Sequence, residues 1–107
     1  MGANAISIQQ EGTVGSQTGI KIAAGTVLAA NPRRLWFAVI NLDDAACYVK
    51  LGAGATTADF HVPLQAGSAA DDGTGGAYFD SSWKGIVSLA PAAGDPRASV
   101  IEMEMAY

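Results

Sequence analysis

The chain has 107 residues, half of them hydrophobic, and a formal net charge of −4 at pH 7. This length fits a single domain. Six basic against ten acidic residues do not make the basic patch with which proteins bind nucleic acid or anionic membranes, so we expect neither as a partner. One cysteine, Cys47, cannot form an intrachain disulfide and favours a reducing compartment. The N-terminus lacks the pattern of a signal peptide, and no apolar run is long enough to span a bilayer.

The first thirty residues differ in character from the rest. Residues 5–9, with Ile6 and Ile8, and residues 19–23 alternate like short strands, whereas residues 11–18 are mostly Gly, Ser, Gln and Thr. Such a segment suits either an arm that adds to a sheet edge, its own or a neighbour's, or an ordinary first hairpin. We therefore divide the chain into an N-terminal arm or first hairpin, residues 1–30, and a β-sandwich domain, residues 31–107.

Residues 34–41 form an apolar run that predicts a strand buried on both sides, with Trp36 in the core. Residues 47–51 alternate and end at a glycine, and Asp43 and Asp44 between the two runs suit a tight turn. The pattern predicts a central hairpin of these two strands.

The C-terminal residues 99–105 alternate with a period of two, which predicts a strand. Ile101, Met103 and Met105 lie on one face, and Glu102 and Glu104 lie on the opposite face, which we expect to be solvated. Weaker strand patterns cover residues 60–64, 77–79 and 85–89, and residues 91–96 are expected to close a last hairpin.

Turn signals recur every eight to twelve residues, and thirteen glycines are spread along the chain. This spacing is typical of an all-β fold. We predict a single antiparallel β-sandwich or jelly-roll-like barrel with an extended N-terminal arm.

The sequence offers little for catalysis. His61, the single histidine, lies in an apolar strand pattern without a nucleophile elbow, and Cys47 lies within a strand, where a free cysteine is usually a small buried hydrophobe. The glycine-rich stretches lack the phosphate-binding signatures. The acidic pairs 43–44 and 71–72 lack the ligand spacing of a calcium loop and suit turns. We expect no enzyme activity, no cofactor and no metal site.

Contact residues are therefore sought among side chains that favour interfaces. Arg33 and Arg34 suit carboxylates of a partner, and Trp83, in a polar connection, is of a type enriched at interface centres. The loop with Asp71 and Asp72 and the arm residues Ile6 and Ile8 complete the candidate contacts. A different class of function, a carbohydrate-binding module, would use Trp83 and Tyr78 as platforms for sugar rings.

The order of strand and turn signals, with Asn31-Pro32-Arg33-Arg34, Tyr48-Val49-Lys50-Leu51-Gly52 and Val62-Pro63-Leu64-Gln65-Ala66-Gly67, resembles small β-sandwich proteins of tailed bacteriophages that decorate or cement the capsid or form head fibres. The likeness covers about residues 31–102. It implies a virion structural protein on the capsid surface, made in the host cytoplasm, that binds the major capsid protein and itself as a homotrimer. A tail or head–tail protein is the alternative within this class.

Overall fold

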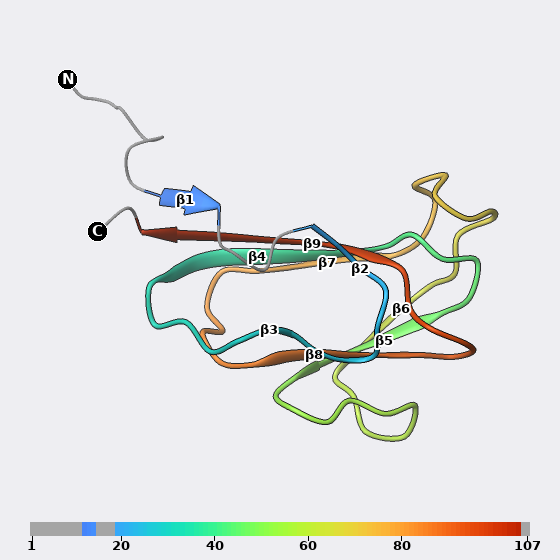
Figure 1. Cartoon of the computed structure of the whole chain (residues 1–107), viewed down its shortest axis with the longest axis horizontal. Coiled ribbons are helices and arrows are strands. Elements are labelled where there is room, and N and C mark those ends of the chain that lie inside the picture. The colour runs from blue at the N-terminus through green and yellow to red at the C-terminus, as the bar shows by residue number, and fades with distance from the viewer. Residues whose placement is uncertain (1–11, 15–18, 106–107) are drawn as a thin grey trace.

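The computed structural model describes residues 12–14 and 19–105 and shows an all-β protein. Its strands form two antiparallel sheets, packed as an upper and a lower layer in Figure 1. The described strands are β1 (Gly12–Val14), β2 (Gly19–Lys21), β3 (Gly25–Leu28), β4 (Arg34–Asn41), β5 (Cys47–Leu51), β6 (Val62–Leu64), β7 (Ala77–Asp80), β8 (Val87–Pro91) and β9 (Ala98–Met105). The described residues include no helix long and apolar enough to cross a membrane.

Sheet A contains β1, β2, β9, β4 and β7, and sheet B contains β3, β8, β5 and β6. In sheet A, β1 and β2 both pair with one side of β9, and β4 pairs with its other side. Strand β7 pairs with β4 and forms the opposite edge of the sheet. Most strands alternate between the sheets along the chain, which is the jelly-roll form of the β-sandwich. The predicted fold class is confirmed.

The core lies between the two sheets and consists mainly of small β-branched and aliphatic side chains. Phe37 is the largest apolar side chain in it. The other buried apolar residues of this cluster are Val27, Leu28, Val39, Cys47, Val49, Leu64, Val87, Leu89, Ala98 and Val100. Burial raises the pKa of the Cys47 thiol to about 11, so the thiolate that cysteine chemistry needs is scarce at neutral pH.

Two predicted hairpins are wrong. Strand β4 belongs to sheet A and β5 to sheet B, and the C-terminal pair β8 and β9 is divided in the same way. The connections, residues 42–46 and 92–97, are long enough to cross the roughly 10 Å between packed sheets. Chain neighbours therefore face each other across the core, and β4 instead pairs with β9 and β7.

The N-terminal region contributes to both sheets. Strand β3, which the sequence pattern did not predict, pairs with β8 in sheet B and places Val27 and Leu28 in the core. Strands β1 and β2 do not form a hairpin with each other but pair in turn with β9. Both strands lie along the edge of sheet A, and β3 of sheet B also lies within residues 1–30.

Candidate functional site: an apolar sheet face

Strand β9 presents the opposite faces from those predicted. Glu102 is only 3% exposed and points into the sandwich with Val100, whereas Ile101 and Met103 point outward and are half-buried. The reversal has a specific cause, since Glu102 Oε2 lies 2.8 Å from Nε of the buried Arg34. An interior cation therefore turns the acidic face of β9 inward and leaves the Ile and Met side chains on the outside.

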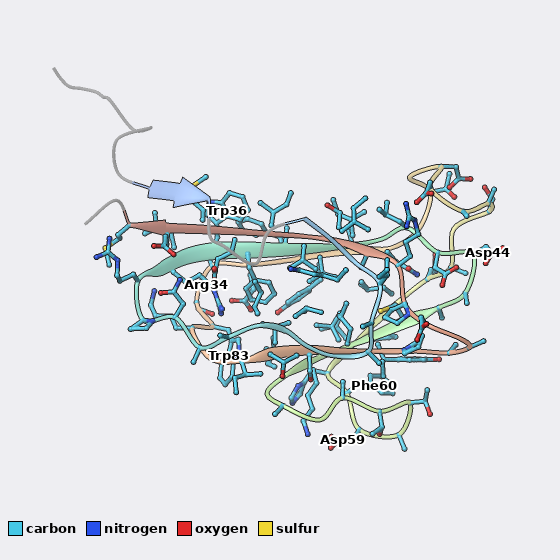
Figure 2. The ribbon with its side chains drawn as sticks, viewed as in Figure 1. Arg34, Trp36, Asp44, Asp59, Phe60 and Trp83 are labelled. Carbon is cyan, nitrogen blue, oxygen red and sulfur yellow. The ribbon has the colours of Figure 1, made fainter. Side chains whose placement is uncertain are left out.

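A bulge in β4 places Arg34 inside. Arg34 lies opposite Glu104 and Trp36 lies opposite Met103, so Leu35 is an extra residue between two successive pairs. In a regular strand without this bulge, Arg34 and Trp36 are two positions apart and would share one face. With it, Arg34 points between the layers while Trp36 lies on the outer side of sheet A, as Figure 2 shows. Trp36 was predicted to lie in the core, and this prediction is wrong: the side chain is half-buried on the outer face.

The outward side chains of sheet A form one continuous surface, which we call the apolar face. The strand register places Phe79 beside Ala38, Ala38 beside Ile101, and Trp36 beside Met103. The rings of Trp36 and Phe79 lie 5.5 Å apart between centroids. The face comprises Ile20, Trp36, Ala38, Ile40, Ala77, Phe79, Ser99, Ile101, Met103 and Met105.

Several of these side chains are strongly exposed. Phe79 is 60% exposed, Ile20 53% and Met105 39%. The outward positions of β2, β4, β7 and β9 carry no charged residue, and Ser99 is their one polar side chain. Scattered apolar residues are ordinary on protein surfaces, but a contiguous apolar patch marks a site of association.

Part of the outer face of sheet B is covered by the protein's own loop, residues 52–61, which lies beneath the lower layer in Figure 1. Ser88 Oγ donates to the carbonyl oxygen of Gly52 at 2.6 Å and accepts from the amide of Ala55 at 3.0 Å. The ring of Phe60 packs against that of Tyr48 at a tilt, with centroids 4.6 Å apart. As a result Ser88 and Ala90 are buried although they point away from the core. The sandwich thus has one face that its own loop partly covers and one apolar face.

The two arginines of the candidate contacts are held within the protein. Arg34, 1% exposed, donates from its guanidinium to the carbonyl oxygens of Ala29 and Gly85 at 2.8 and 2.9 Å, as well as to Glu102. It cannot reach a partner in this conformation. Arg33 is half-buried, and its guanidinium donates to the carbonyl oxygen of Met105.

The acidic loop candidates are exposed but engaged locally. Asp71 forms an ion pair of 2.6 Å with Arg97. Asp72 accepts hydrogen bonds from Ser68 and from both the amide and hydroxyl of Thr74, and these lower the pKa of Asp72 to about 2. These bonds shape a loop that is joined to the end of β4, where the Asp71 amide donates to the carbonyl oxygen of Leu42. Among the described residues, no three His, Cys, Asp or Glu side chains gather as metal ligands would.

The Trp83 side chain packs against the rest of the protein and does not project from the surface as a contact residue would. Its indole Nε1 donates to the carbonyl oxygen of Ile86 at 2.9 Å, and its ring packs against the core. A Cβ on Gly85 would lie 2.5 Å from the indole, so glycine is needed there.

The last two candidate contacts, Ile6 and Ile8, lie outside the described residues. Sequence reasoning thus missed the apolar face, although Ile101, Met103 and Met105 already form its stripe on β9.

The turn before Trp83 predicts an acid-sensitive contribution to stability. Burial raises the pKa of Asp80, but hydrogen bonds from the Trp83 amide, the Tyr78 hydroxyl and Ser82 outweigh it and lower that pKa from 3.8 to about 2. A carboxyl with a lowered pKa stabilises the fold above pH 4, and this contribution is lost as the pH falls towards 2.

We expect Asp80→Asn to remove this pH-dependent part, about 1 kcal/mol after allowance for solvent screening. Urea unfolding at pH 6 and at pH 2.5, compared between the two proteins, measures it. Parallel losses of stability on acidification in both proteins would contradict the assignment.

No protein-family model, curated protein or solved structure matches this chain. The geometry of the two sheets and of the apolar face therefore provides the basis for assigning function.

Proposed function

We propose that this chain is a non-enzymatic structural protein that works by binding other protein subunits, and more specifically that it decorates the outer surface of a tailed-phage capsid. The apolar face is the observation that carries the first part, because an uncharged surface with protruding aromatic and aliphatic side chains suits a protein partner. The likeness in strand and turn order supports the second part.

The construction of the sandwich suits a structural role. Both ends of β4 carry a buried polar residue, Arg34 or Asn41, that joins β4 to loops from elsewhere in the chain. Such cross-links hold the sheet that bears the apolar face in one shape. The net charge of −4 also suits a protein on the outside of a capsid, away from packaged DNA.

The carbohydrate-binding alternative is disfavoured, because the two aromatic side chains that it requires are partly buried. Trp83 and Tyr78 both pack against the core, and the Tyr78 hydroxyl donates to Asp80 at 2.7 Å. A sugar ring needs an exposed aromatic face on which to stack. Among the described Phe, Tyr and Trp side chains, the one most exposed to solvent is instead Phe79, on the apolar face.

Co-sedimentation with capsids tests the proposal. The particles are assembled from a tailed-phage major capsid protein sought in the genome that encodes this chain, and we expect the full chain to pellet with them and to saturate. Phe79→Ala should weaken binding about 30-fold, the effect of losing a hot-spot contact of about 2 kcal/mol.

Phe60→Ala, which removes an aromatic ring from the sheet B side, is the matched control and should bind as the wild type does. Folded protein that stays in the supernatant at every concentration would overturn the proposal. Binding to isolated tails or head–tail connectors, but not to capsids, would place the protein elsewhere in the virion.

A further inference from the structure

We infer that the apolar face is the contact surface between two copies of this chain, which pack sheet A against sheet A about a two-fold axis. This inference rests on the proposed function in one respect: both take the apolar face to bind protein. It goes further by naming a second copy as the occupant in the absence of capsids, so pairing and capsid binding compete for the face.

Charge favours a second copy as that occupant. Each copy carries a net charge of −4, so two copies repel each other unless the contact itself is free of acidic groups. Asp43 and Asp71 lie in loops at the end of β4, where Asp71 pairs with Arg97. Asp59 lies on the far side of sheet B, as Figure 2 shows. The described part of the apolar face is uncharged, so two copies can meet there without burying like charges.

The size of the face fits a small homodimer. Strands β4 and β9 have eight residues each, which corresponds to about 26 Å at the rise of an antiparallel strand. Four neighbouring strands span about 19 Å across. The face therefore measures roughly 500 Å², and two such faces together bury about 1,000 Å², the lower limit for a specific interface. We expect a reversible dimer with a dissociation constant in the micromolar range.

The shape of the apolar face is suited to packing against the same face of a second copy. The large side chain of Phe79 lies directly beside the small Ala38 on the next strand, and Ala77 precedes it on the same face. Projections therefore alternate with hollows, as in the interdigitated core between two packed sheets about 10 Å apart. A two-fold contact uses the same patch on both copies. The homotrimer implied by the resemblance would instead need two different surfaces on each copy.

Sedimentation velocity of the full chain over a range of micromolar concentrations tests the inference. We expect a monomer–dimer equilibrium in the wild type. Phe79→Asp should weaken it by at least about 100-fold, because a two-fold axis places the new carboxylate in the interface twice. Thr26→Asp adds the same charge at an exposed strand position of sheet B and should leave the equilibrium unchanged. Circular dichroism confirms that both variants are folded.

Three outcomes would overturn the inference: a wild type that remains monomeric at the highest concentration, a dimer that Phe79→Asp leaves intact, or a trimer. A chain lacking residues 1–11 that dimerises when the full chain does not would show that the protein's own N-terminal segment occupies the face, and would overturn it too. Failure here is distinct from failure of the proposed function. A monomer that binds capsids through Phe79 contradicts only the pairing, and a dimer that ignores capsids contradicts only the decoration role.

Discussion

Arg34→Ala is expected to lower the free energy of unfolding by about 3–5 kcal/mol, because it leaves the buried Glu102 carboxylate without its cation. The guanidinium lies between the layers, 2.8 Å from Glu102 and 5.3 Å above the Phe37 ring. It also donates to carbonyl oxygens of Ala29, Trp83 and Gly85. One side chain therefore joins β4, β9, the segment after β3 and the connection before β8. Urea unfolding followed by tryptophan fluorescence measures the loss.

The double variant Arg34→Met with Glu102→Met is the control that isolates the charge. Two apolar side chains fill the site and leave no buried ion, so the part of the loss caused by the buried carboxylate should return. The part caused by the lost hydrogen bonds to the carbonyl oxygens of Ala29, Trp83 and Gly85 should remain. A single Glu102→Met variant should be nearly as unstable as Arg34→Ala, since it leaves the arginine unpaired. If Arg34→Ala costs less than about 1 kcal/mol, the ion pair does not hold the sandwich together.

Asn41→Leu is expected to lower the free energy of unfolding by about 2–3 kcal/mol, since the net loss of several buried hydrogen bonds adds up at about 1 kcal/mol each. Asn41 is fully buried at the last residue of β4. Its side-chain amide donates to the carbonyl oxygens of Ala45 and Gln65, both at 2.9 Å, and its oxygen accepts from the amide of Asp43. Leucine has nearly the same size, so the change removes the bonds without opening a cavity.

Thermal unfolding by calorimetry compares Asn41→Leu with Asp44→Ala. Asp44 is exposed in the same connection, and its replacement should change stability by less than about 0.5 kcal/mol. Equal melting temperatures of the Asn41→Leu protein and the wild type would show that the loops are held by other contacts.

The two predictions concern the same physical problem at opposite ends of β4. A strand that enters and leaves a sandwich must join loops whose backbone groups are partly buried, and those groups need partners. Arg34 supplies donors at the start and Asn41 supplies donors and an acceptor at the end. The apolar face depends on this arrangement, because it is the register of β4 and β9 that turns Trp36, Ile101 and Met103 outward.

The residue order by itself determined the fold class and most of the strands. Alternation, β-branched runs and regularly spaced turn residues are local properties, and they predicted residues 34–41, 47–51 and 99–105 close to where β4, β5 and β9 lie. Strand β3 was missed because its four residues, Gly25–Leu28, are too few to show a period.

Only the tertiary structure decided which strands pair and which way each face points. A period of two separates Ile101 from Glu102 but is the same whichever of them points inward. In β9 the buried cation of Arg34 determines that Glu102 points inward. A one-residue bulge at Leu35, which the sequence pattern does not reveal, places that cation inside. The physical reason is that burying a carboxylate is costly unless a cation meets it, and whether one does depends on strands 68 residues apart in the chain.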